Sequence, residues 1–210
     1  MSWDERYTEY VESPTHREGP DLDRIAEWVP AGSVALDVAT GGGHVARRLR
    51  EAGSTVVTCD ASPGMQPDVV CRAEDIPFDD DSFDVVVTRI AAHHFADIGG
   101  ALAEMTRVTR DLLLVEDTLY RGPEVEEAER LRDPSHVRMY TEDEWRDLLE
   151  DAGIGVHAIE IFDKSEPLEG WIARTGCTGQ DAERVREPVT DWIEDGVFHS
   201  RRILLMGRKR

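Results

Sequence analysis

Apolar segments typical of buried strands alternate with amphipathic helical segments along most of the chain, and this alternation restricts the fold more than any other feature. The expected strands cover residues 34–38, 55–59, 69–71, 83–88, 112–115, 156–162 and 203–207. Between them, apolar residues recur with helical spacing, as in 45–52, 98–108 and 145–152. Strands that alternate with helices form mostly parallel sheets. We therefore expect an α/β, Rossmann-like doubly wound fold with helices on both faces.

The 210 residues fit a single domain spanning 1–210. Helical spacing before the first strand predicts an N-terminal helical cap over 1–31, in which Ser13-Pro14 separates two helices. Residues 164–200 contain tryptophans and a proline between the last two strands, and they are expected to form a small helical insert. The link between the second and third strands, 61–68, is too short for a full crossover helix and predicts a single turn.

The chain is strongly acidic, with 44 Asp and Glu residues, 24 Lys and Arg residues and a formal net charge of −20. This balance argues against a nucleic-acid partner held through phosphates and against an anionic membrane surface. Lys164 and Lys209 are the only lysines, so nearly all basic residues are arginines. The pattern is typical of a halophilic protein, because high salt screens surface repulsion. An arginine-biased genome is the alternative explanation.

Cys59, Cys71 and Cys177 are odd in number and lack Cys-x-x-Cys spacing, which excludes a disulfide framework and a cysteine zinc site. The histidines form no recognisable metal-binding pattern. No apolar run reaches the ~18 residues of a membrane span. The acidic start of the chain, residues 1–5, is unlike a signal peptide. We therefore expect a cytoplasmic protein with no metal and no membrane insertion.

A glycine-rich loop follows the first expected strand. Gly41, Gly43 and Ala46 match the spacing G-x-G-x-x-A, and Asp60 follows 19 residues after Gly41. Glycines at this point remove side chains where a ligand approaches the backbone. The spacing suits NAD and S-adenosylmethionine about equally, and a tight turn with no ligand is a further alternative.

Three acids favour S-adenosylmethionine over NAD. Asp37 lies inside the first strand, where a carboxylate needs a cationic partner such as an amino acid ammonium group. Asp60 ends the second strand, where it can accept hydrogen bonds from ribose hydroxyls. Asp75 follows the third strand, where it can accept from an adenine amino group while Ile76 packs on the ring. No basic residue surrounds the glycine loop to bind a pyrophosphate, and none follows Asp60 to bind the 2′-phosphate of NADP.

Five motifs in order carry a resemblance to a known family. They are LDVATGGGH at 36–44, CDASPGM at 59–65, AEDIPF at 73–78, DSFD at 81–84 and RIAAHHF at 89–95. The chain resembles the class I S-adenosylmethionine-dependent methyltransferases, in the small-molecule group similar to the quinone C-methyltransferases, in the branch with AAHHF after strand four. The resemblance extends to LRDPSHVR at 131–138, to Glu144-Trp145 and to residues 13–16.

The resemblance implies a seven-stranded sheet whose last strand is antiparallel. It implies contacts to the methionine moiety from Asp37, Ala39 and Gly41, to the ribose from Asp60, and to the adenine from Met65, Asp75 and Ile76. The full set of expected cofactor-binding residues is Asp37, Ala39, Thr40, Gly41, Gly43, Asp60, Ala61, Met65, Glu74, Asp75, Ile76, Arg89 and His94.

The chain departs from the family pattern at three places. Ala39 replaces the first glycine of the usual loop. The helix after the second strand is nearly absent, which affects the Ser62–Met65 wall of the expected adenine site. Thr109-Arg110-Asp111 replaces the Pro-Gly-Gly turn before the fifth strand.

The segment after the fourth strand bears on the methyl acceptor. Nucleic-acid base N-methyltransferases resemble one another in an Asn/Asp-Pro-Pro-aromatic motif there, whereas this chain has Arg89-Ile90-Ala91-Ala92. His93 and His94 follow at the edge of the sheet where ligands bind. We expect His93 on the acceptor side as a catalytic base and His94 on the cofactor or helix side. Alternatively, both histidines only cap or pack the next helix, since methyl transfer needs mainly positioning.

Further candidates for binding the acceptor are His16, Arg132, His136 and Arg138. The last three lie after the fifth strand and could form a lid over an anionic or phenolic acceptor. Alternatively, they form a charged turn neutralised by Asp133 and Glu142. The charged residues from Glu124 to Arg130 are expected to form a solvated helical face.

The function that these observations favour is S-adenosylmethionine-dependent C- or O-methylation of a small-molecule acceptor by direct in-line transfer. One alternative is a non-catalytic module that binds S-adenosylmethionine or S-adenosylhomocysteine. The other is an NAD-dependent oxidoreductase, although the chain contains no Tyr-x-x-x-Lys pair.

Overall fold

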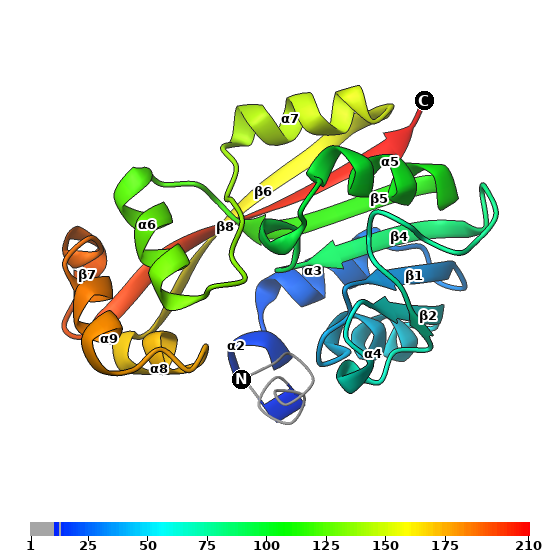
Figure 1. Cartoon of the computed structure of the whole chain (residues 1–210). Helices are drawn as coiled ribbons and strands as arrows, with labels where there is room; N and C mark the ends of the chain where they lie inside the picture. The colour runs from blue at the N-terminus through cyan, green and yellow to red at the C-terminus, as the bar shows by residue number, and fades with distance from the viewer. Residues whose placement is uncertain (1–10, 13) are drawn as a thin grey trace.

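The computed structural model describes residues 11–12 and 14–210, which form one sheet with helices on both faces (Figure 1). The strands run in the order β3-β2-β1-β4-β5-β8-β6. Their bounds are β1 Val34–Val38, β2 Thr55–Asp60, β3 Val69–Val70, β4 Phe83–Arg89, β5 Thr109–Thr118, β6 Ile154–Pro167 and β8 Val197–Lys209. A two-residue strand, β7 Ile193–Glu194, pairs with β8 beside this path.

Strands β1 to β5 pair in parallel, while β8 is antiparallel to both β5 and β6. The α/β prediction and the antiparallel last strand are therefore confirmed. The path holds the seven expected strands, and β7 is an addition that the sequence did not indicate. Strand β5 begins at Thr109, so Thr109-Arg110-Asp111 belongs to the strand and does not form a turn before it.

Alternating side chains of the central strands supply two separate apolar layers. Leu36 and Val38 pack with α5 (Ile98–Val108) and α7 (Glu142–Asp151) on one face. Ala35 packs on the other face with α3 (Pro20–Trp28) and α4 (His44–Glu51). Helix α7 starts with the capping box of Thr141 and Glu144. The expected helices 45–52, 98–108 and 145–152 are therefore present, with ends shifted by a few residues.

A third apolar cluster lies at the end of the sheet where β6 and β8 extend beyond the other strands as a long antiparallel pair (Figure 1). Trp171 of α8 (Leu168–Ala173) stacks on Phe198 of β8, with ring centroids 4.2 Å apart. Helices α6 (Pro123–Arg132) and α9 (Gly179–Arg186) and the 3-10 turn η4 (Thr190–Trp192) complete this end. The two ends of the expected insert, 164–167 and 197–200, belong to β6 and β8.

The N-terminal region contributes α2 (Pro14–Arg17) and α3, while the helix expected over residues 3–11 lies mainly outside the described residues. The link after β2 contains only the 3-10 turn η2 (Pro63–Met65), as its length predicts. No helix among residues 11–12 and 14–210 is both long and apolar enough to span a membrane.

Candidate functional site

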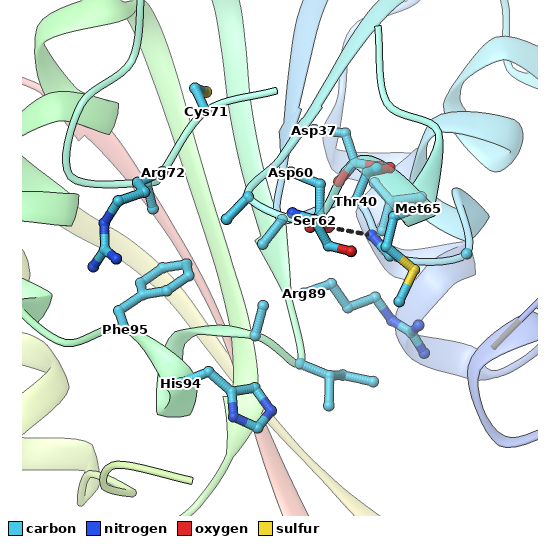
Figure 2. A pocket seen from close by; sticks show the side chains of 18 of the residues that line it. Asp37, Thr40, Asp60, Ser62, Met65, Cys71, Arg72, Arg89, His94 and Phe95 are labelled. Carbon is cyan, nitrogen blue, oxygen red and sulfur yellow. Dashed lines mark hydrogen bonds between the residues drawn. The ribbon is translucent and has the colours of Figure 1, made fainter. Parts of the chain in front are cut away.

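A cavity of about 460 Å³ opens at the carboxyl ends of β1, β2 and β4. We call it the glycine-loop cavity, because residues 39–42 form part of its wall (Figure 2). The order of the strands reverses at this point, with β2 on one side of β1 and β4 on the other. Ligands of open α/β sheets bind at such switch points. The volume is in the usual range for small-molecule and cofactor sites.

Asp37 carries a buried carboxylate into this cavity from β1 and is 1% exposed. Its Oδ2 accepts hydrogen bonds from Thr40 Oγ1 at 2.7 Å and from the Ala46 backbone N–H at 3.1 Å. Oδ1 has no hydrogen-bond partner within residues 11–12 and 14–210. Burial raises the pKa of Asp37 to about 6, against the hydrogen bonds from Thr40 and Ala46 that lower it. The arrangement suits a cationic ligand group, which would restore the ionised form.

The loop after β1 reaches the cavity through left-handed backbone conformations. Gly41 has φ 50° and Gly43, the N-cap of α4, has φ 71°. Ala39 has φ 56°, so the residue that replaces a glycine keeps the conformation that glycine favours. An L-residue with a Cβ is strained there. The backbone path therefore explains why the usual residue at position 39 is glycine.

Asp60 at the end of β2 connects two segments of the cavity wall. Its Oδ2 accepts from the Gly41 backbone N–H at 3.0 Å, and its Oδ1 accepts from the Ser62 N–H at 2.9 Å. Each carboxylate oxygen can accept a further hydrogen bond. Asp60 therefore both fixes the glycine loop and presents acceptors to a ligand.

Most of the cofactor-binding residues expected from the sequence line this one cavity. They are Asp37, Ala39, Thr40, Gly41, Asp60, Ala61, Met65, Glu74, Arg89 and His94. His16, expected on the acceptor side, also lines it.

Three expected residues, Gly43, Asp75 and Ile76, lie outside the lining. A Cβ at Gly43 would meet nothing within 4 Å, so its contribution is its backbone conformation. Asp75 pairs its backbone with Arg72 in a tight turn that leaves its side chain exposed. Ile76 points into the apolar core and is 2% exposed. The adenine contacts expected from Asp75 and Ile76 therefore stay a prediction, because their side chains lie outside this lining.

Apolar walls come partly from residues that sequence reasoning missed. Phe95 and Ala73 line the cavity, and Figure 2 shows Phe95 across from Met65. Glu74 uses its Oε1 to accept from the backbone N–H groups of Ala96, at 3.1 Å, and Asp97. Phe95 is the last residue of the motif RIAAHHF, and its place in that motif was the signal that could have identified it.

Arg89 at the end of β4 fastens the N-terminal region to the sheet. It is 9% exposed, donates from Nε to Asp21 Oδ2 at 2.7 Å and donates from Nη1 to the His16 carbonyl at 3.0 Å. Its Nε also lies 3.1 Å from Glu116 Oε2 on β5. The next residue, Ile90, has φ 54°, which is a strained conformation for a β-branched side chain.

A second, smaller cavity of about 40 Å³ adjoins the first, and His16, Ile90 and His94 line both. We call it the histidine cavity, because His93 and His136 also line it. Its walls come from α2, the 3-10 turn η3 (Ala92–His94), β5, α6, α8 and the paired strands β6 and β8, which are far apart in the sequence.

His93 is held by a buried carboxylate. Its Nδ1 lies 2.5 Å from Asp117 Oδ1, and its backbone N–H donates to Asp117 Oδ2 at 2.7 Å. Burial disfavours the charged ring, but the charge and hydrogen bond of Asp117 raise the pKa of His93 above its ordinary value. No hydrogen bond to Nε2 is found in the described part of the chain. A histidine oriented through Nδ1 with its Nε2 accessible has the geometry of a general base.

His94 lies next to His93, with ring centroids 4.0 Å apart, but contacts the glycine-loop cavity as well. Its Nδ1 lies 3.1 Å from the Ser135 carbonyl. Burial, followed by the charge of His93, lowers the pKa of His94 to about 3. Of the two neighbours, His93 is therefore the stronger base.

Of the three expected lid residues, two are buried and one is exposed. Arg132 and His136 line the histidine cavity, with Glu129 2.6 Å from Arg132 Nη2 and Glu126 2.7 Å from His136 Nε2. Arg138 lines neither cavity and pairs with Glu144 at the surface. The neutralising acids are thus not Asp133 and Glu142.

The expectation of a solvated face over Glu124–Arg130 holds for Glu124, Glu127 and Arg130, which are exposed, and is wrong for Glu126 and Glu129. Glu126 and Glu129 are 5% and 7% exposed. Glu129 pairs with the buried Arg132 in the wall of the histidine cavity, whereas Glu126 lies 2.7 Å from Nε2 of the buried His136 and accepts from the Met139 N–H. Among residues 11–12 and 14–210, no group of three or more His, Cys, Asp or Glu side chains is arranged to hold a metal ion.

Comparison with known proteins identifies the family. Residues 36–112 match the family described as Methyltransferase domain. The uncharacterised methyltransferase YcgJ of Bacillus subtilis (strain 168) is 30% identical over 205 residues, which cover 86% of this chain and 80% of that protein. A demethylmenaquinone methyltransferase of Beutenbergia cavernae is 37% identical over 89 residues, 38% of this chain and 37% of that enzyme. A further relative, YafE of Escherichia coli (strain K12), is matched over only 53% of its length.

The crystal structure of a Bacillus halodurans C-125 protein described as a methyltransferase superposes with a TM-score of 0.82 at 28% identity. The superposition covers 91% of this chain and 99% of that one. The match to YcgJ covers more than two thirds of each chain. The chain therefore belongs to the class I S-adenosylmethionine-dependent methyltransferases.

Proposed function

We propose that the protein transfers the methyl group of S-adenosylmethionine to an oxygen or carbon atom of a small-molecule acceptor. The observation that carries this proposal is the pair of adjoining cavities. The glycine-loop cavity has the acids and volume for the methyl donor, and the histidine cavity holds the His93–Asp117 pair beside it. His16, Ile90 and His94 form the boundary across which the methyl group would pass.

The residues present fit S-adenosylmethionine. Asp37 Oδ1, which accepts no hydrogen bond from residues 11–12 and 14–210, suits the ammonium of the methionine moiety. Asp60 suits the ribose hydroxyls, and Met65 and Phe95 enclose the adenine from opposite sides. S-adenosylmethionine would supply a methyl group on a sulfonium, whose sulfur keeps the bonding electron pair and leaves as S-adenosylhomocysteine.

His93 has the role of base in this proposal. Asp117 accepts the Nδ1 proton, so Nε2 can take the proton from a hydroxyl or acidic carbon of the acceptor. The acceptor's electron pair then forms the new bond to the methyl carbon. His94 remains neutral beside the cationic sulfonium because of its low pKa. The proposed acceptor is a small molecule and not a nucleic acid.

Calorimetric titration and mass spectrometry test the proposal. We expect S-adenosylmethionine and S-adenosylhomocysteine to bind and NAD not to bind. A small molecule that co-purifies with the protein would then be offered as acceptor, and S-adenosylhomocysteine should accumulate. Absence of S-adenosylmethionine binding would refute the proposal. Binding without turnover for the retained molecule and for pools of small acids and phenols would favour the non-catalytic module.

We also propose that the protein works in a reducing, high-salt cytosol, based on its net charge of −20 and its three free cysteines. The melting temperature should rise steadily as KCl increases to about 1 M, where the Debye length is ~3 Å. A scan in NaCl and a second in sucrose of equal osmolality separate charge screening from general solute effects. A flat or falling curve in KCl would favour the explanation by genome bias.

A further inference from the structure

Arg202 carries buried donors in the wall of the histidine cavity. It lies on β8, is 5% exposed and lines that cavity. Its Nε and Nη1 have no hydrogen-bond partner within residues 11–12 and 14–210. Glu116 Oε1 lies 3.6 Å from Nη1, too far for a hydrogen bond. A buried guanidinium normally has its donors satisfied, because unpaired buried polar groups are costly.

The other two arginines of this cavity already have partners. Arg132 donates to Glu129 at 2.6 Å, and Arg174 donates to Glu166 at 2.6 Å. The remaining acid of the lining, Asp133, accepts from Ser135 N and Oγ at 3.0 and 2.6 Å. Of the three arginines that line the histidine cavity, Arg202 is therefore the one with no hydrogen bond to a carboxylate among the described residues.

Arg202 shares its acidic neighbours with Arg89: the charges of both arginines lower the pKa of Asp21, whose carboxylate accepts a hydrogen bond from Arg89. Glu116 is fully buried between Arg202 and Arg89, and burial raises its pKa to about 7, so part of it is neutral at neutral pH. At the boundary of the two cavities, burial and then the charges of Arg174, Arg202 and Arg89 hold the pKa of His16 well below its ordinary value. The positive charges of three guanidinium groups thus act at His16, and they favour an anion at this boundary.

The size of the histidine cavity limits the anionic group. One water-sized atom needs roughly 10–15 Å³ of such volume. A cavity of about 40 Å³ therefore holds about three heavy atoms, the number in a carboxylate. A phosphate or sulfate has five. Planar carboxylates also match the fork of guanidinium donors.

We propose that the histidine cavity binds a carboxylate of the methyl acceptor on Arg202, so that the substrate class is small organic acids. The inference rests on the proposed function and names its substrate class. The carboxylate is an anchor and is not itself methylated. With the carboxylate filling this cavity, the neighbouring hydroxyl or acidic carbon lies at the boundary with the glycine-loop cavity, which His16, Ile90 and His94 line.

The test uses acetate and its neutral analogue acetamide as probes. Both are titrated into the full-length protein saturated with S-adenosylhomocysteine, at neutral pH and constant ionic strength, with binding followed by NMR. We expect saturable binding of acetate and none of acetamide. Equal binding of the two probes, or no saturation by acetate, would overturn the proposal.

Two variants on one strand assign the binding to Arg202. Arg202→Met should weaken acetate binding roughly tenfold or more, since a charge-assisted bidentate pair is lost. Arg201→Met is the matched control: it is the adjacent residue, its side chain is 57% exposed, and it pairs with Asp163 at the surface. It should leave acetate binding within about twofold. Wild-type affinity in Arg202→Met would overturn the proposal.

A third variant keeps the test valid if Arg202→Met does not fold. Glu116→Gln removes the carboxylate that competes for Arg202, so acetate should bind more tightly. If Arg202 served only to neutralise Glu116, acetate affinity would not increase, and the proposal would fail. Titration of each protein with S-adenosylhomocysteine distinguishes failure of the proposed function from failure of the carboxylate site. If the wild-type protein does not bind S-adenosylhomocysteine, the proposed function is refuted. If it binds S-adenosylhomocysteine but not acetate, only the carboxylate site is refuted.

Discussion

The glycine-loop cavity is lined by residues between Asp37 and Phe95 together with His16, whereas the lining of the histidine cavity extends from His16 on α2 to Arg202 on β8. The first is shaped by loops at strand ends, where backbone N–H groups bind Asp37 and Asp60. The second is shaped largely by buried charged side chains from distant elements, such as Glu116 beside Arg89 and Arg202, and Asp117 beside His93.

This difference shows how the two cavities are specified. A loop beside its own strand can be inferred from a local motif, because the residues that hold it are close in sequence. A buried ion pair between distant elements depends on the assembled fold. The part of the site common to many class I methyltransferases is thus encoded locally, and the part proposed to select the acceptor is encoded by tertiary contacts.

The largest expected effect concerns His93, in the histidine cavity. His93→Ala should lower turnover roughly 10²-fold or more, the usual scale for loss of a general base. Cofactor affinity should stay within about twofold, because His93 does not line the glycine-loop cavity. The measurement is kcat with the identified acceptor, beside calorimetric titration with S-adenosylhomocysteine.

A positioning variant refines this result. Asp117→Asn removes the charge that raises the pKa of His93, so the rise of kcat with pH should move to lower pH as well as shrink. If transfer depends on positioning alone, both variants keep turnover within a few-fold and the pH profile does not move. A large loss of cofactor affinity in His93→Ala would contradict its assignment to the acceptor side.

The next effect tests the glycine-loop cavity. Asp60→Ala should weaken binding of S-adenosylmethionine by about tenfold or more, since charge-assisted hydrogen bonds contribute roughly 1.5–3 kcal/mol. Asp75→Ala is the matched control, because its side chain is exposed and outside the lining. The sequence motif predicts a loss for both variants, and the structure predicts a loss only for Asp60. Unchanged affinity in a folded Asp60→Ala would remove that residue from the site.

Asp37 should make cofactor binding depend on pH. Its pKa of about 6 lies well above that of an ordinary aspartate, and the ammonium of S-adenosylmethionine binds the ionised form. Affinity should therefore be full above the pKa and fall as pH decreases, by about tenfold between pH 7 and pH 5, as expected for one titrating group. Asp37→Asn should bind weakly with no such change. Equal pH dependence in both proteins would assign the titration elsewhere.

Several features were predictable from the sequence because their causes are local. The Thr141–Glu144 capping box, the turn at Pro63–Met65 and the glycine loop all depend on residues within one turn or link. The strand segments were predictable where both faces are apolar. These signals gave the fold and most of the residues that line the glycine-loop cavity.

The histidine cavity was not predictable in the same way. Strand β5 was expected to end at Val115, because Glu116 and Asp117 look like the start of a loop, yet both are buried within the strand. Arg202 was not among the expected site residues, and Glu129 was expected on a solvated helical face. Glu116 and Arg202 lie opposite each other only in the assembled sheet, and no spacing in the sequence encodes that contact, whereas Glu129 pairs with Arg132 three residues later in α6.

The smallest expected effect tests whether the glycine-loop cavity depends on its backbone. Ala39 has φ 56°, where an L-residue costs about 1–2 kcal/mol, while glycine loses about 0.5–1 kcal/mol of chain entropy on folding. Ala39→Gly should therefore stabilise the protein by at most about 1 kcal/mol, a rise in melting temperature of roughly 2–4 °C. Ala52→Gly is the control, because Ala52 has φ −82° and carries no such strain. It should destabilise by about 0.5–1 kcal/mol.

A strained alanine also restricts the loop, so Ala39→Gly should bind S-adenosylmethionine slightly less well despite its higher stability. If both substitutions destabilise equally, the loop stores no strain, and the backbone contribution to this cavity is smaller than its geometry indicates.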